Sequence, residues 1–209
     1  MSVSCIVLAG GKSKRLGRNK LTEVIGQMSL IETVVTRLSE LKTPIIVVTA
    51  SDSVIPHLSQ YTATKIVQDI FPEKGTLGGI YTGLYESGTY HNMVVACDMP
   101  FINLNLLSYM AGEAPDYDVV VPRTTDGVLE PLHAIYSKHC MEPIEFLIKQ
   151  GRLSVLELYP MVKVKYLEAS TINLLDPENL SFFNINTESD LVKGRQLADQ
   201  NKDISHDKC

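Results

Sequence analysis

A cluster of basic residues follows the first apolar segment of the chain. Residues 8–20 read LAGGKSKRLGRNK, in which five cations and no acid follow two adjacent glycines. Glycines let backbone N–H groups approach a ligand closely, and the cations favour an anion such as a phosphate. The segment is therefore a candidate anion site, although its composition alone also suits a basic surface loop.

Two common phosphate-binding motifs are absent from this segment. The P-loop requires a glycine five residues before Gly11, where the chain has Ile6. The dinucleotide fingerprint requires a glycine at position 12, which is a lysine. The sequence therefore argues against both a P-loop NTPase and a simple dinucleotide-dependent oxidoreductase.

An acidic residue and three glycines mark a second segment, residues 69–80, which reads DIFPEKGTLGGI. Glycines around the start of a predicted helix allow a base or ribose to approach the backbone closely. Asp69 suits the paired N–H donors of guanine if its carboxylate faces a ligand, and is an ordinary turn residue if it does not. Both interpretations of Asp69 stay open, and Gly78 and Gly79 belong to the same candidate site.

The third segment is CDMP at residues 97–100, where Asp98 follows a buried apolar run and precedes a rigid X-Pro turn. A carboxylate oxygen is the natural ligand for Mg²⁺ bound to nucleotide phosphates. Capping of the next helix, the other role open to Asp98, fits Asn103 better. We therefore expect Asp98 to hold Mg²⁺.

Two downstream segments also carry polar side chains. Asn184 and Asn186 are two positions apart in a predicted strand, so their side chains would point to the same side and satisfy backbone groups or line a cleft. His133, in the run EPLHAIY at residues 130–136, is expected to be a strand-face residue and not a catalyst. The sequence suggests no convergent partner for the other histidines, His57, His91, His139 and His206.

Short β-branched runs alternate with amphipathic stretches along the first half of the chain. This order predicts parallel strands joined by right-handed crossovers, and hence a three-layer α/β/α sandwich with a Rossmann-like, mostly parallel sheet. Ligands bind such sheets at the carboxyl ends of the strands, where the three segments begin. The predicted strands are 3–8, 44–49, 65–68 and 93–97, and the predicted helices are 29–41 with a Ser29–Glu32 capping box, 53–60, 76–86 and 103–114.

The second half is less regular and predicts an antiparallel addition to the sheet. We expect one domain over residues 1–200 and a flexible tail over residues 201–209. The predicted strands here are 119–122, 132–136, 162–167 and 182–185, with a turn at 125–127, and the predicted helices are 139–150, 154–159 and 188–199, the last capped by Thr187.

Composition excludes several classes of protein. A chain of 209 residues that is 44% hydrophobic can bury a core, so it is not intrinsically disordered. A net charge of -5 argues against a dedicated nucleic-acid binder. The four cysteines show no paired spacing, and the apolar start is too short for a membrane span. We expect a cytoplasmic protein without a membrane or nucleic-acid partner.

Together the motifs resemble the MobA-like nucleotidyltransferases, and most closely the molybdenum cofactor guanylyltransferases. The resemblance rests on LAGG followed by RLG and a lysine, on Asp69 with GTLGGI, on CDMP, on EPLHAIYSK and on NINTESDL. It spans residues 3–192 and implies a fold of the nucleotide-diphospho-sugar transferase type. The chain departs from the family pattern at Thr76, at Arg18-Asn19 and at residues 49–51.

The resemblance implies transfer of GMP from Mg·GTP to the terminal phosphate of molybdopterin, with release of pyrophosphate. The acceptor phosphate is itself the nucleophile, so catalysis would consist of positioning and electrostatic stabilisation. It also implies transient contact with other molybdenum cofactor proteins. By resemblance, the nucleotide is held by the backbone of Leu8, Ala9, Gly10 and Gly11, and its phosphates are bound by Arg15 and Lys20. Mg²⁺ is held by Asp98, and the base is seated by Asp69, Gly78 and Gly79. The molybdopterin side is faced by Asn184 and Asn186.

The departures leave the choice among GTP, CTP and ATP open. A cytidylyltransferase or a sugar-phosphate nucleotidyltransferase of the same fold is the alternative within this class of reaction. A nucleotide-binding module without turnover is the alternative from another class.

Overall fold

The computed structural model of the chain describes residues 2–10, 20–50, 58 and 63–206. For Lys20 and for residues 201–206 it describes the backbone alone.

A seven-stranded sheet forms the centre of the molecule, with the strand order β5-β4-β1-β6-β8-β7-β9. β1 pairs in parallel with β4 and β6, and β4 with β5, whereas β8 is antiparallel to both of its neighbours. β9 is parallel to β7. The strands are β1 (Val3–Ala9), β4 (Ile45–Thr49), β5 (Thr64–Gln68), β6 (His91–Ala96), β7 (Val119–Pro122), β8 (His133–Ser137) and β9 (Val164–Leu167). The predicted mostly parallel sheet with an antiparallel addition is confirmed.

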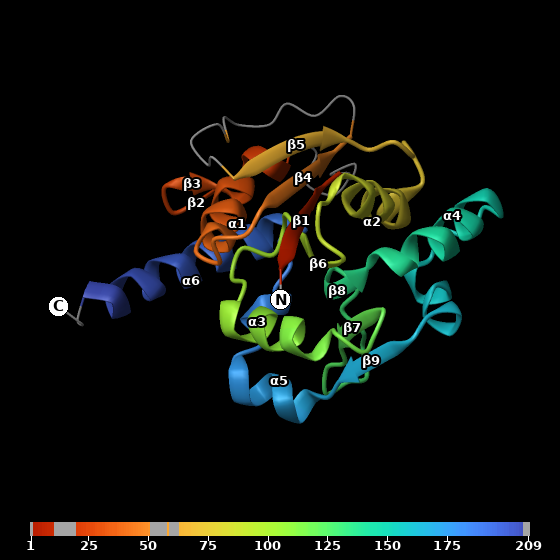
Figure 1. The fold of residues 1–209 in the computed structure, drawn as a ribbon. Coiled ribbons are helices and arrows are strands. Elements are labelled where there is room, and N and C mark those ends of the chain that lie inside the picture. Colours follow the sequence, from red (N-terminus) through yellow and green to blue (C-terminus); the bar gives the residue numbers. More distant parts are fainter. Residues whose placement is uncertain (1, 11–19, 51–57, 59–62, 207–209) are drawn as a thin grey trace.

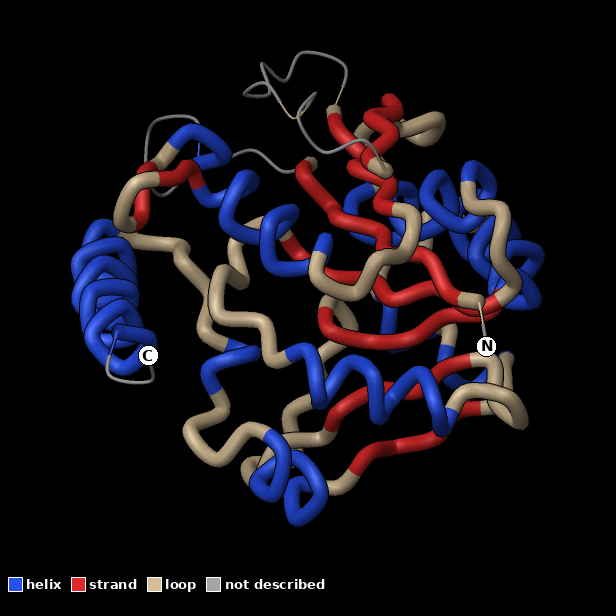
Figure 2. The backbone as a smooth tube through the Cα atoms, turned by 60° about the vertical axis from the view of Figure 1, so that its left-hand side comes forward, coloured by secondary structure: helices blue, strands red, loops and turns tan. Residues whose placement is uncertain are grey.

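Helices cover both faces of this sheet (Figures 1 and 2). Side chains alternate along β1, so Cys5 and Val7 join the core cluster under α1, α3 and α5, while Ile6 and Leu8 join the cluster under α2 and α4. The three-layer sandwich is therefore confirmed. The helices are α1 (Leu30–Ser39), α2 (Gly75–Glu86), α3 (Leu104–Glu113), α4 (Met141–Lys149), α5 (Ala169–Leu175) and α6 (Glu188–His206).

The predicted helix caps are observed. Ser29 and Glu32 form a capping box at the start of α1, in which Ser29 N donates to Glu32 Oε2 at 2.9 Å. Asn103 caps α3 by accepting from Asn105 N and Leu106 N. Because Asn103 fills this role, Asp98 is not needed as a cap.

The strand predicted at residues 182–185 is wrong. The chain forms a short 3-10 helix, η5 (Leu180–Phe182), and then runs without regular structure to residue 187. β6 is already paired on both edges, by β1 and β8, so no ladder position is open to this segment. It crosses the end of β6 instead, where Ile185 N donates to Asp98 O at 3.0 Å.

Several other elements differ from the sequence-based expectation. The helix predicted at residues 154–159 consists of two 3-10 turns, η3 (Val155–Glu157) and η4 (Tyr159–Met161), and another precedes α4 as η2 (Lys138–Cys140). The hairpin of β2 (Val24–Ile25) and β3 (Met28–Ser29) and the helix α5 were not predicted. The helix predicted at residues 53–60 falls almost entirely on residues outside the described part.

The last helix, α6, begins where predicted, with Asp190 N donating to Thr187 Oγ1 at 3.2 Å. It continues to His206, past the predicted end at residue 199. Leu191 packs with Ile25, Leu30 and Ile185 in a small third cluster, so α6 joins the β2–β3 hairpin to the segment beside Asp98. In the described part of the chain, no helix has the length and apolarity to cross a membrane.

Candidate active site at the carboxyl edge of the sheet

The parallel strands bring three of the predicted segments to one edge of the sheet. The register aligns Ala9 at the end of β1 with Thr49 at the end of β4, and Thr49 with Gln68 at the end of β5. Cys97 N, just after β6, donates to Leu8 O at 3.2 Å. The loops that follow β1, β5 and β6 therefore start at the same edge of the sheet, where ligands bind in folds of this kind.

The basic segment is only partly described. Leu8 and Ala9 are buried at the end of β1, so their side chains belong to the core, and the predicted role of their backbone stays a prediction. Gly10 is exposed, and Lys20 begins a short 3-10 helix, η1 (Lys20–Thr22). Gly11 and Arg15 lie outside the described residues, as does the side chain of Lys20, so their predicted roles stay predictions.

Asp69 organises the turn between β5 and α2. Its Oδ1 accepts a hydrogen bond from Phe71 N at 2.9 Å and another from the Thr82 hydroxyl at 2.8 Å. The same hydroxyl accepts from Ile70 N at 3.1 Å. The turn role considered for Asp69 is thus present, and a base-reading role remains open to Oδ2 alone.

The glycines of α2 have a packing role in addition to the predicted one. A Cβ on Gly78 would lie 2.8 Å from Phe71 O, and a Cβ on Gly79 would lie 3.2 Å from Leu8 Cδ2. Gly83, which was not singled out from the sequence, leaves even less room, because a Cβ there would lie 2.4 Å from Ile6 Cγ2. The spacing of Gly79 and Gly83, four residues apart on one helix face, is the signal that reveals this close approach of α2 to β1.

Asp98 is half-buried at the carboxyl end of β6, at the centre of the candidate site. A carboxylate there suits Mg²⁺, which is usually held by one or two protein carboxylates together with substrate phosphates. Within the described residues, no three His, Cys, Asp or Glu side chains converge to bind a metal by themselves. The position of Asp98 therefore fits a metal that a nucleotide would deliver.

Asn184 and Asn186 are brought beside Asp98, but not by the predicted strand. The hydrogen bond from Ile185 N to Asp98 O places the residue between them at the end of β6. Asn184 Nδ2 donates to Phe182 O at 3.0 Å, and Asn186 N donates to Asp190 Oδ2 at 3.0 Å. The argument that both side chains share one face of a strand is wrong, and their role toward molybdopterin stays a prediction.

Glu130, which was not a predicted site residue, lies at the same edge of the sheet. Glu130 N donates to Pro122 O at the end of β7, and Leu132 O accepts from Ala96 N at the end of β6, both at 3.1 Å. The carboxyl group is half-buried, and burial raises its pKa above the ordinary value. An acid directly before a proline at the start of a strand was the available signal.

His133 behaves as a strand-face residue. Its ring is fully buried in β8 and meets the Phe182 ring edge-on, with the ring centroids 5.3 Å apart. Burial lowers the pKa of His133 to about 3. The ring is therefore neutral at physiological pH and buried away from solvent, which suits core packing and not proton transfer.

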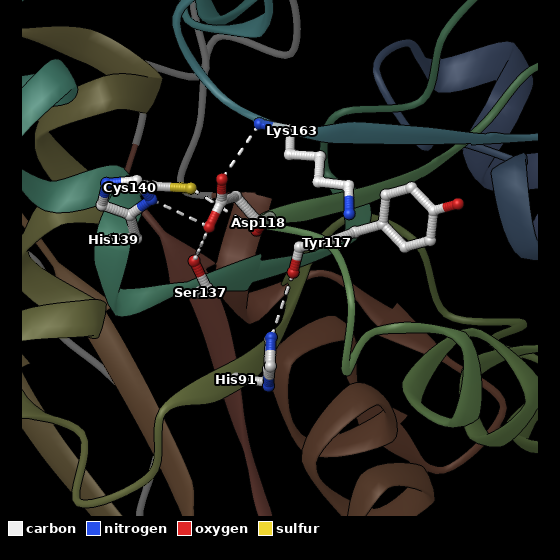
Figure 3. A network of polar contacts seen from close by, with 7 residues as sticks. All are labelled: His91, Tyr117, Asp118, Ser137, His139, Cys140 and Lys163. Carbon is white, nitrogen blue, oxygen red and sulfur yellow. Dashed lines mark hydrogen bonds and ion pairs between the residues drawn. The ribbon is translucent and has the colours of Figure 1, made fainter.

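A separate polar cluster lies at the opposite edge of the sheet, around Asp118 (Figure 3). Asp118 Oδ1 lies 3.0 Å from both Ser137 Oγ and His139 Nδ1, and Oδ2 accepts from Lys163 N at 2.9 Å. His91 Nε2 lies 3.1 Å from Tyr117 O. His91 and His139 therefore have polar partners that the sequence did not reveal.

This Asp118 cluster is structural. The serine hydroxyl is directed at the carboxylate and not at the histidine, so the arrangement is not a nucleophile activated by a base. It ties together the start of β7, the end of β8 and the start of β9, on the edge away from Asp98.

The chain shares its sequence pattern and its fold with known proteins. Residues 5–164 match the family model of the MobA-like NTP transferase domain. It is 34% identical over 197 residues to the probable molybdenum cofactor guanylyltransferase of Pelotomaculum thermopropionicum, covering 94% of each chain. It is 32% identical over 194 residues to the molybdenum cofactor guanylyltransferase of Desulfosudis oleivorans, covering 92% of this chain and 94% of the other.

Solved structures support the same assignment. The molybdopterin-guanine dinucleotide biosynthesis protein A of Archaeoglobus fulgidus superposes with a TM-score of 0.82 at 27% identity, over 95% of this chain and 100% of the other. The 4-diphosphocytidyl-2C-methyl-D-erythritol synthase of Anaerococcus prevotii has a TM-score of 0.70 at 13% identity, over 95% and 98% of the two chains, which shows a shared fold alone. Matches over most of the chain, with the motifs gathered at one sheet edge, show that the chain is a nucleotidyltransferase and belongs to the MobA-like NTP transferase family.

Proposed function

We propose that this enzyme transfers GMP from Mg·GTP to the terminal phosphate of molybdopterin, giving molybdopterin guanine dinucleotide and pyrophosphate. The observation that carries the proposal is the contact between the segment of Asn184 and Asn186 and the backbone of Asp98. It joins the predicted acceptor-binding residues to the predicted metal-binding carboxylate at one strand end. The relatives that match over nearly the whole chain are named for this activity.

In this reaction an oxygen of the molybdopterin phosphate attacks the α-phosphorus of GTP. The bond from the α-phosphorus to the oxygen that bridges to the β-phosphorus breaks, and pyrophosphate leaves with that bond's electron pair. Bound Mg²⁺ would neutralise charge on the phosphate oxygens. The phosphate is already a nucleophile, so the protein needs no covalent intermediate.

The chain's own part is to hold the two substrates in line. The backbone after β1 binds the nucleotide, and Arg15 and Lys20 compensate the charge that builds up on its phosphates. Asp98 would hold the metal that binds the nucleotide phosphates. The remaining proposed contacts are those of Asp69, Gly78 and Gly79 with the base and those of Asn184 and Asn186 with molybdopterin.

Incubation of the protein with molybdopterin, Mg²⁺ and each nucleoside triphosphate in turn tests the proposal. We expect the guanine dinucleotide, identified by its mass, and one pyrophosphate for each product, from GTP only. A product with CTP or ATP would show that the assignment of GTP as the substrate is wrong. Binding of a nucleotide without any product would favour a nucleotide-binding module that has no catalytic activity. We further propose that the enzyme works in the cytoplasm and meets other molybdenum cofactor proteins transiently.

The metal assignment has its own test. Asp98→Asn keeps the side-chain size but removes the charge, so we expect pyrophosphate release to fall at least a hundredfold while metal-free binding of GTP persists. Near-normal turnover of Asp98→Asn would refute the assignment.

A further inference from the structure

Glu130 is held rigidly at the reactive edge of the sheet. Its N–H donates to Pro122 O, and its own carbonyl accepts from His133 N at 3.0 Å, which closes the turn at residues 130–133. Leu132 O, inside that turn, accepts from Ala96 N at the end of β6, two residues before Asp98. The backbone of Glu130 is therefore fixed between the ends of β6 and β7.

The carboxyl group of Glu130 lacks the hydrogen bonds that the carboxyl groups of Asp69 and Asp118 accept. Among the described residues it has neither a hydrogen-bond donor nor a cation as partner, and its half-burial alone raises its pKa. Arg123, which directly follows Pro122, pairs with Glu168 instead and lies over the Tyr166 ring at 5.4 Å. Since neither oxygen of Glu130 is occupied by a described donor, both can accept hydrogen bonds from a ligand.

The strand order decides which substrate this carboxylate can meet. β5, β4 and β1 lie on one side of β6 and carry the segments expected to bind the nucleotide, whereas β8, β7 and β9 lie on the other side. Asp98, at the end of β6, separates the two halves. A substrate that presents its phosphate at Asp98 from the β8 side would place the rest of its body over the turn at residues 130–133.

We propose that Glu130 binds the acceptor substrate through a pair of adjacent N–H donors, of the kind found on the 2-amino-4-oxo edge of a pterin ring. A carboxylate has two oxygens that can accept both hydrogen bonds at once, which gives geometric specificity. This inference rests on the proposed function for the identity of the acceptor. It adds a residue that selects the acceptor by its ring, at a distance from the phosphate that reacts.

Two soluble fluorescent probes, pterin and lumazine, allow a direct test. They differ at ring position 2, where pterin has an amino group and lumazine has a carbonyl group. Wild-type protein should bind pterin more tightly than lumazine, because the carbonyl of lumazine removes a donor and faces the carboxylate. In Glu130→Gln, pterin binding should weaken roughly 10- to 100-fold, and the preference over lumazine should be lost. Asp126→Asn, at an exposed position in the same β7–β8 connection, is the control and should leave both affinities unchanged.

Kinetics with the full acceptor give the second measurement. The KM for molybdopterin should rise in Glu130→Gln by a similar factor, while the KM for GTP should stay within about twofold of the wild-type value. Equal melting temperatures would show that the Gln variant is folded.

The outcomes separate this inference from the proposed function. If wild-type protein makes the dinucleotide but Glu130→Gln leaves the KM for molybdopterin and the pterin preference unchanged, the role of Glu130 is wrong and the function stands. If pterin binds through Glu130 but no nucleotide yields a product, the function is wrong and the pterin site stands. Wild-type protein that binds pterin and lumazine equally would overturn the inference.

Discussion

Asp69 and Asp98 are carboxylates at the ends of parallel strands, but their surroundings differ. Asp69 Oδ1 is engaged by the turn and by Thr82, whereas the backbone of Asp98 is joined to the segment of Asn184 and Asn186. Local architecture accounts for the presence of an acid at position 69, so a role in reading guanine must come from Oδ2. For Asp98 the position at the site's centre supplies the functional argument.

Substitution of Asp69 separates the two roles of this residue. Asp69→Asn can keep the acceptor for Phe71 N and Thr82, so stability should change little, whereas the new amide donors would face the N–H groups of guanine. We expect the KM for GTP to rise roughly tenfold, while the affinity for CTP, measured as inhibition of the reaction with GTP, is unaffected. Equal effects on both nucleotides would leave Asp69 with the turn role alone. Asp69→Ala, as the matched variant, should also lower the free energy of unfolding by about 1–3 kcal/mol.

The buried ring of His133 makes stability depend on pH. In the unfolded chain its pKa is the ordinary 6.5, and in the folded protein it is about 3. Between these two pKa values the ring is protonated in the unfolded chain but stays neutral in the folded protein. The contribution of His133 to the free energy of unfolding is therefore fully present above pH 6.5 and decreases as the pH falls toward 3. For this one group the slope approaches about 1.4 kcal/mol per pH unit.

Urea unfolding of His133→Leu at pH 7 and pH 5 measures this contribution. The variant should lose less stability on acidification than the wild type, by about 2 kcal/mol between these two values. An apolar side chain of similar size should also cost little at pH 7, because both ring nitrogens of His133 lack a hydrogen-bond partner among the described residues. Parallel losses in the two proteins would contradict the neutral buried state of His133.

At the scale of elements, α2 lies unusually close to β1. The approach is set by Gly79 and Gly83, whose missing side chains make room for Leu8 and Ile6. Since Leu8 precedes the glycines that are expected to hold the nucleotide, the packing of α2 also determines where that backbone lies. The packing of α2 against β1 is thus expected to affect nucleotide binding as well as stability.

The glycines of two helices provide a matched pair of substitutions. Alanine normally stabilises a helix relative to glycine by about 1 kcal/mol. Gly83→Ala should nevertheless destabilise the protein by about 1–3 kcal/mol, because its Cβ would meet Ile6 Cγ2 at 2.4 Å. Gly112→Ala in α3, where nothing lies within 4 Å, should be neutral or stabilising. Chemical unfolding of both variants gives the comparison, and similar shifts in both would contradict close packing at Gly83.

The elements that the sequence predicted well are those with strong local signals. β1 and α1 show apolar runs and periodicity that hold in isolation, and the Ser29–Glu32 box marks a helix start directly. The segment at residues 182–185 has a strand-like pattern too, but its fate depended on β8 filling the edge of β6. That competition is non-local, and no property of the segment itself reveals it.

The same limit applies to the candidate site. The ends of β1 and β6 could be placed together from the order of the elements, so the position of Asp98 at the carboxyl edge was predictable. Glu130 could not be found in this way, because its half-burial and its lack of a partner depend on where Arg123 and the turn at residues 130–133 lie. Helix α5 was missed because its pattern is weak, with Leu174 left 83% exposed.

At the scale of the whole molecule, the two edges of the sheet differ in the residues that they carry and in the roles of those residues. The carboxyl edge carries the candidate substrate groups, while the opposite edge carries the Asp118 cluster that ties β7, β8 and β9 together (Figure 3). Burial acts to raise the pKa of Asp118, but the hydrogen bonds from Lys163 N, His139 and Ser137 outweigh it, and the pKa is lowered. The ionised form of Asp118 is therefore stabilised by folding.

Asp118→Asn should weaken the fold without touching the chemistry. We expect the free energy of unfolding at pH 7 to fall by about 1–3 kcal/mol, and kcat/KM below the unfolding transition to stay at the wild-type value. The contribution of Asp118 is present above its unfolded pKa of 3.8 and is lost as the pH falls through its lower folded value, so the difference between the variant and the wild type should shrink in acid. Asp116→Asn, an exposed position with the same change of charge, is the control and should leave stability almost unchanged. A loss of kcat/KM in folded Asp118→Asn would show that the two edges are coupled, and would end the division of the sheet into a substrate edge and a structural edge.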